Sequence, residues 1–126
     1  MSGVANAAPA VTSTIDVQLR ALENGTDAVV LDTGVSYLPA RPVRIHVRKR
    51  DGRYDMSDDA AAVTLAGRPL GWLATMTHAV AERGMNVNRR GVIFVTGFEG
   101  RDLASLARRL AECSRLTYLT LLETSD

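Results

Sequence analysis

The feature that most constrains this sequence is a predicted β-hairpin at residues 43–56. Apolar and basic or polar side chains alternate over residues 43–48, which is the period of a strand with one buried face. The Asp-Gly pair at 51–52 favours a two-residue type I′ turn, because that turn requires positive φ at both positions. Such a turn fixes the register of the two strands and places Arg48 opposite Asp55, a pair of opposite charge.

The predicted register gives the hairpin one apolar face and one basic face. Turn chemistry, hydrophobic pattern and the sign of the facing charges all support the same register. We therefore expect the apolar face to pack on the core and the basic face to meet solvent. The apolar face comprises Ile45, Val47, Tyr54 and Met56, and the basic face comprises Arg44, His46, Arg48, Arg50, Arg53 and Asp55.

The rest of the chain alternates predicted helices with pairs of short strands. Residues 116–122 fit either a longer last helix or an edge strand, because they are rich in Thr, Tyr and Leu. Paired strands and segregated helices predict an α+β fold, a small antiparallel sheet of hairpins packed on one side by three to four helices. Helices are expected at 13–24, 58–66, 69–83 (with Leu70, Leu73 and Met76 on the buried face) and 102–115, and further strands at 28–32, 35–38, 85–88 and 92–96.

Length and composition limit the chain to one domain. We expect a single α+β domain at 13–126 after a disordered tail at 1–12. The tail has no basic start before an apolar run, so it does not resemble a signal peptide, and no apolar run reaches membrane-spanning length. With 15 Lys plus Arg and 14 Asp plus Glu, no global field attracts nucleic acid or membrane. We expect a cytoplasmic protein that binds no membrane.

We expect no catalytic residue, no cofactor and no metal. Cys113 lies among leucines and alanines, which favours a buried thiol over an activated nucleophile. His46 and His78 have no third ligand at suitable spacing. One enzymatic alternative stays open, a metal-dependent enzyme that uses Asp55, Asp58 and Asp59, because carboxylates suit Mg²⁺. The favoured role of Asp58 and Asp59, however, is to cap a helix that follows Ser57.

The basic segment 41–53 has two interpretations. An arginine-rich β-ribbon can enter a nucleic-acid groove, where guanidinium groups contact phosphates and base edges. The other interpretation is a solvated strand face that discourages pairing with other chains. We favour the solvated face, because Asp55 offsets Arg48 and the segment lacks interleaved exposed aromatic residues for stacking bases. Nucleic-acid binding through 41–53 remains an alternative.

The run from Arg44 to Gly67 combines a strand, a turn, a second strand and a Ser-Asp-Asp-Ala step at 57–60 into a short helix. This arrangement resembles a bacterial and phage family of unknown function, whose members have Ser/Thr-Asp-Asp-Gly at the same step. The order of later elements extends the resemblance over about residues 28–115. The family implies no established activity. Its occurrence among prophage and mobile-element genes implies an accessory role, such as inhibition, immunity or conflict.

Taken together, these observations favour a non-enzymatic, macromolecule-binding accessory protein. The expected partner is another protein, and a second copy of the chain is one option. Besides the basic hairpin face, the segment 118–122 could pair strands with a partner if it is an exposed edge. The expected binding residues are Arg44, His46, Arg48, Arg50, Arg53 and Tyr118.

Overall fold

The structure, a computed structural model that describes residues 17–124, has the α+β fold that the sequence predicts. The expected tail at 1–12 lies outside the described residues. The strands are β1 (Ala28–Leu38), β2 (Arg41–Arg50), β3 (Arg53–Ser57), β4 (Asn86–Val87) and β5 (Ile93–Phe98). The helices are residues 17–23, α2 (Ala61–Ala66), α3 (Trp72–Ala81), the 3-10 turn η2 (Gly100–Asp102) and α4 (Leu103–Thr124).

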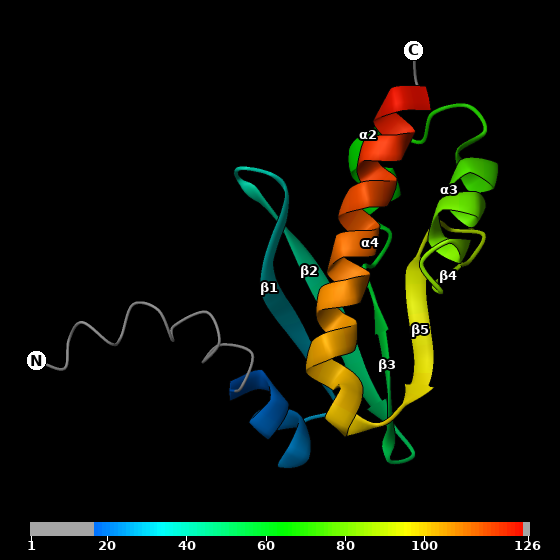
Figure 1. Ribbon diagram of the computed structural model, residues 1–126. Helices are drawn as coiled ribbons and strands as arrows, with labels where there is room; N and C mark the ends of the chain where they lie inside the picture. Colours follow the sequence, from blue (N-terminus) through cyan, green and yellow to red (C-terminus); the bar gives the residue numbers. More distant parts are fainter. Residues whose placement is uncertain (1–16, 125–126) are drawn as a thin grey trace, which may run out of the picture.

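The described strands form one antiparallel sheet in the order β1-β2-β3-β5-β4. In Figure 1, α4 runs across the sheet and α3 lies beside it. Helix α4 contacts β1, β2, β3 and β5, so it covers much of one sheet face. Helices on one side of an antiparallel sheet are the expected arrangement. No helix within residues 17–124 is long and apolar enough to cross a membrane.

The β2–β3 hairpin has the predicted turn and register. Asp51 and Gly52 both adopt positive φ, at 52° and 78°, as a type I′ turn requires. Arg48 lies opposite Asp55 across the two strands, and alternate side chains of β2 are buried. The prediction for this hairpin is therefore confirmed in both its turn and its register.

An aliphatic core fills the space between the sheet and α4. Side chains from the covered face of the sheet meet a buried stripe along the helix. Burying one large apolar side chain stabilises a domain by roughly 1.5–3 kcal/mol. Cys113 belongs to this core, which confirms the expected buried thiol. The fully buried core side chains include Leu31, Ile45, Met56, Ile93, Leu103, Leu110 and Leu121.

Helix α4 continues to Thr124, so residues 116–122 are helical and are not an edge strand. Tyr118 is buried, and its ring packs edge-on against Tyr37 of β1 with 5.5 Å between ring centroids. This contact joins the last turns of the helix to the sheet. The expectation that Tyr118 belongs to an exposed binding surface is therefore wrong.

Strand β1 is one strand of 11 residues rather than the two short strands that we expected. Its pairing with β2 shifts register after Asp32. At this point Gly34 adopts a φ of 87° and donates its N–H to the Asp32 carboxylate at 2.9 Å. Such an irregularity bends an edge strand without ending it.

The helix α3 begins later than the sequence predicts. Gly71 has a φ of 77°, so the regular helix begins only at Trp72. Leu70 therefore precedes the helix and is fully exposed, whereas we expected it on the buried face. Leu73, in the first turn of α3, is also exposed and not on the buried face as expected, whereas Met76 and Val80 are buried, so the predicted stripe is confirmed only from Met76 onward.

Candidate functional site

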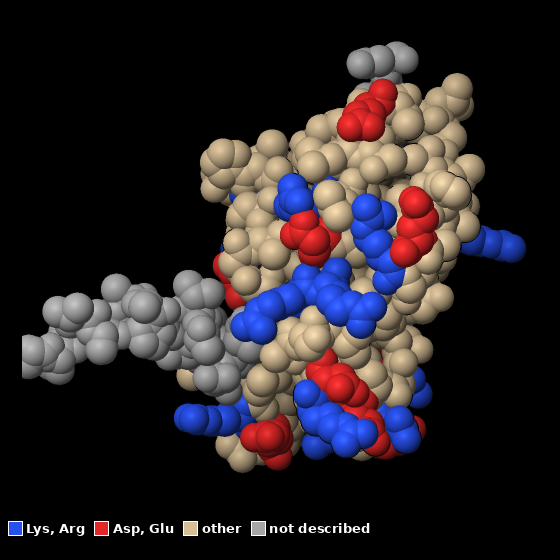
Figure 2. Space-filling view, viewed as in Figure 1, with Lys and Arg blue, Asp and Glu red and all other residues tan. Residues whose placement is uncertain are grey.

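The candidate site is the face of the sheet that points away from α4, which we call the open face. Exposed side chains alternate with buried ones along β2, and Arg44, His46 and Arg48 are among the exposed ones. These three residues were expected on the exposed face of the hairpin. Figure 2 shows the other side of the molecule, where α4 lies and where basic and acidic side chains are interspersed.

A hollow of about 790 Å³ lies on the open face. Arg48 and Arg90 border it, and the half-buried ring of Phe94 adds apolar surface. Neither arginine forms an ion pair within residues 17–124. The hollow is lined by Ala28, Val29, Val30, His46, Val47, Arg48, Asp55, Met56, Ser57, Asp59, Asn88, Arg90, Phe94 and Thr96.

Asp55 pairs with Arg50 and not, as we expected, with its direct neighbour Arg48. Arg50 Nε donates to Asp55 Oδ2 at 2.8 Å, and its Nη2 donates to Oδ1 at 3.1 Å. Oδ1 also accepts the N–H of Gly97 at 3.0 Å. A long side chain can reach such a diagonal position on a sheet face. The hydrogen bond from Arg50 holds the pKa of Asp55 below its ordinary value.

Three other side chains of the basic hairpin face lie near acceptors or opposite an acid. Arg53 Nη1 donates to the carbonyl of Gly97 at 3.1 Å. His46 Nε2 lies 3.9 Å from the Asp59 carboxylate, and Arg44 lies opposite Asp32 across β1 and β2. The open face therefore carries charges of both signs and is not a uniform basic patch.

The three acids of the metal hypothesis are not gathered into one site. Asp55 is engaged by Arg50 on the open face, Asp59 is exposed near His46, and Asp58 is buried on the covered side. Within residues 17–124, no group of three or more His, Cys, Asp or Glu side chains is placed to hold a metal ion.

Asp58 lies in a buried polar network. Ser114 Oγ donates to Asp58 Oδ2 at 2.7 Å, and the Tyr37 hydroxyl lies 2.6 Å from Ser114 Oγ. Oδ1 accepts the N–H groups of Ile93 at 2.9 Å and Ala60 at 3.0 Å. The network thus links β1, β5, α4 and the connection before α2. We expected Asp58 in the first turn of the helix after Ser57, but α2 begins only at Ala61, so Asp58 precedes that turn and is buried.

Burial raises two pKa values in this network. Burial raises the pKa of Asp58, and hydrogen bonds from Ser114 and from main-chain amides partly offset that effect. Burial also raises the pKa of Tyr37. Asp58 and Ser114 are fully buried and hydrogen-bonded. Such a buried network organises the core.

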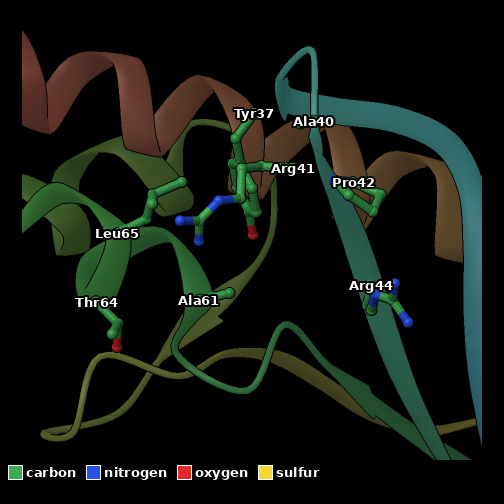
Figure 3. A pocket seen from close by; sticks show the side chains of 8 residues that line it. All are labelled: Tyr37, Ala40, Arg41, Pro42, Arg44, Ala61, Thr64 and Leu65. Atoms are coloured by element: carbon green, nitrogen blue, oxygen red, sulfur yellow. The ribbon is translucent and has the colours of Figure 1, made fainter.

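A second hollow, of about 540 Å³, lies between the β1–β2 turn and α2. In Figure 3, Arg41 points into this hollow toward Leu65, whereas Arg44 points away from α2. Tyr37 and Thr64 also line it. Of the two arginines among its described lining residues, Arg41 and Arg44, Figure 3 shows only Arg41 directed into the hollow, so it offers fewer charged contacts than the open face.

Sequence reasoning missed half of the open-face hollow. Arg90, Phe94 and Thr96 join the hairpin residues because β5 pairs with β3. The sequence predicts a strand at 92–96, whose side chains alternate between the two faces of the sheet. No local pattern indicates which strand it pairs with. The site thus combines three segments of the chain, at 28–30, 46–59 and 88–96.

No known family model matches this chain, and no curated protein or solved structure matches it. The resemblance at residues 44–67 therefore stays a prediction. The fold and the site define a one-sided α+β sheet whose open face carries a hollow of mixed polarity.

Proposed function

We propose that this chain is a non-enzymatic binding protein that docks another protein on its open face. The hollow is the observation that supports this proposal. Val30 and Phe94 supply apolar surface, and Arg48 and Arg90 supply charges without an ion pair in the described chain. A partner that fits would insert an apolar side chain and place carboxylates beside the two arginines.

The distribution of charge favours a protein partner over nucleic acid. Asp32, Asp55 and Asp59 lie on the open face among the basic side chains, and the net charge of the chain is +1. A polyphosphate backbone gains most from a continuous basic path, whereas protein interfaces match charges of both signs. Inhibition or immunity, which the family resemblance implies, would be one form of such binding.

Two neighbouring arginines provide a matched test. Arg90 lines the hollow and Arg89 does not, although both are exposed in the same turn. Immobilised full-length protein is incubated with a nuclease-treated extract of the source organism, and retained proteins are quantified by mass spectrometry. Arg90→Glu, and Thr96→Trp, which fills the hollow, should each reduce one retained protein by about tenfold. Arg89→Glu should retain that protein as the wild type does.

Equal loss with Arg89→Glu would contradict the proposal, because charge alone would then explain retention. Retention seen only in a parallel extract that has not been treated with nuclease would contradict it as well. Each variant is checked by circular dichroism, and all three positions are exposed, so the fold should be kept.

Nucleic acid is a second candidate, and one observation favours it. Arg48 and Arg90 line the same hollow as the half-buried ring of Phe94 on an open sheet face, and proteins bind single strands by stacking bases on aromatic rings among cations. Fluorescence anisotropy with single-stranded RNA and DNA should then show affinity that falls steeply with salt. Arg48→Ala with Arg90→Ala should abolish binding, and Arg50→Ala is the control because Asp55 engages Arg50. Binding unchanged in the double variant rules this candidate out.

A further inference from the structure

Strand β1 is an edge of the sheet, and its outer side pairs with no other described strand. The Lys49 N–H donates to the Asp27 carbonyl at 2.8 Å, which sets the phase of hydrogen bonding between β1 and β2. Main-chain groups alternate in direction along an antiparallel strand. The N–H and C=O groups of Ala28, Val30 and Asp32 therefore point outward from the sheet.

We propose that β1 pairs with β1 of a second copy of this chain, antiparallel and with the two-fold axis at Val30. In this register Val30 faces Val30 of the second copy, and Asp32 faces Ala28 of the second copy. The outward main-chain groups would form about six hydrogen bonds across the axis. Val30 is 42% exposed in the single chain, and its counterpart would cover it.

Charge complementarity selects a second copy in this register. Ala28 lies beside Arg48 on β2, so both side chains share the open face. Asp32, facing Ala28 of the second copy, would approach Arg48 of the second copy across a small side chain. Arg48 has no ion pair within the described residues of its own chain. A register with the two-fold axis at Asp32 would instead place the Asp32 carboxylates of the two copies opposite each other, which is unfavourable.

Pairing through β1 would also join the two open faces. Ala28, Val29 and Val30 line the hollow at the β1 edge, so the hollows of the two copies would meet at the axis. A long unpaired edge strand is a route to open-ended aggregation, and a closed two-fold pairing removes it. The pairing would occupy Val30 and Arg48 at the β1–β2 side of the hollow, and it would leave Arg90, Phe94 and Thr96, at the β4–β5 side, for the protein partner proposed above.

The first test measures the mass of the full chain in solution by sedimentation. The wild type should have twice the chain mass of 13.6 kDa at micromolar concentration. Val30→Lys places two ammonium groups at the axis and should give the single-chain mass. Ser36→Lys makes the same change further along β1, beyond the register shift, and should stay dimeric. A wild type of single-chain mass, or a dimeric Val30→Lys variant, overturns the proposal.

The second test requires the two copies to meet at one position. Val30→Cys would place two thiols across a hydrogen-bonded pair whose Cα atoms lie about 5.5 Å apart, within the range of a disulfide. Native Cys113 is buried, so the introduced thiol is the accessible one. Mild oxidation should convert most of the Val30→Cys protein to a covalent dimer and leave Ser36→Cys uncrosslinked. Equal crosslinking of both variants, or none, overturns the register.

Discussion

Asp55 and Asp58 lie three residues apart in the sequence and occupy opposite environments. Asp55 is on the open face, where its carboxylate pairs with Arg50. Asp58 is on the covered face, fully buried, and accepts a hydrogen bond from Ser114 and others from main-chain amides. Strand alternation explains the difference, because Met56 and Asp58 share the face that packs beneath α4 while Asp55 has the opposite face.

The comparison shows that position in the sheet decides what a carboxylate does in this protein. On the open face, an arginine partner lowers the pKa of Asp55, and solvent limits the energy of the pair. On the covered face, burial raises the pKa of Asp58, and donors from separate elements form hydrogen bonds to its carboxylate. The open face is therefore tolerant of substitution and suited to binding, whereas the covered face is not.

The largest expected effect is the loss of the Asp58 acceptor. Asp58→Ala should lower the free energy of unfolding by about 4 kcal/mol, because it leaves two amides and the Ser114 hydroxyl without an acceptor in the core. Asp58→Asn keeps an oxygen for the amides and should cost less than half as much. Urea unfolding followed by circular dichroism measures both. Asp59→Asn, at the exposed neighbour, should change stability by no more than about 0.5 kcal/mol. Comparable losses at the two positions would remove the distinction between the faces.

The pH dependence of stability should reveal burial at Asp58. Between the ordinary pKa of about 3.9 and the raised pKa, Asp58 keeps a proton in the folded chain that it has lost in the unfolded chain. The resulting stabilisation is complete below the ordinary pKa and is lost as pH rises through the raised pKa. The stability of the wild type relative to Asp58→Asn should therefore fall as pH rises through this window. Urea unfolding over a series of buffers measures the difference, and a difference that rises with pH would contradict it.

Local chemistry was sufficient to predict the hairpin that defines this contrast. Its turn, register and two faces depend on residues close in sequence, and all are confirmed. The elements that were missed depend on distant contacts or on special backbone conformations. Residues 116–122 suit a strand by composition, but Tyr118 packs on Tyr37 as part of α4. Leu70 precedes α3 and is exposed, because the positive φ of Gly71 makes the regular helix begin only at Trp72.

The candidate site was predicted in part for the same reason. Arg44, His46 and Arg48 follow from alternation along β2. Phe94 enters the hollow only through the pairing of β5 with β3, which no local pattern specifies. The burial of Asp58 was within reach, since strand alternation extends to it, but an acid before an expected helix favoured a cap.

The smallest expected effect is the pH dependence that Asp55 contributes, and its sign is opposite to that of Asp58. Because Arg50 lowers the pKa of Asp55, the stabilisation is complete above the ordinary value of about 3.9 and is lost as pH falls through the lowered pKa. The stability of the wild type relative to Asp55→Asn should thus rise with pH in acid and then stay level to neutrality. Since the pair meets solvent, the effect should shrink in high salt, unlike that of Asp58. Urea unfolding over a pH series at low and high salt measures this effect. If the stability difference between wild type and variant changed with pH in the same direction for Asp55 as for Asp58, burial would not be what separates the two faces.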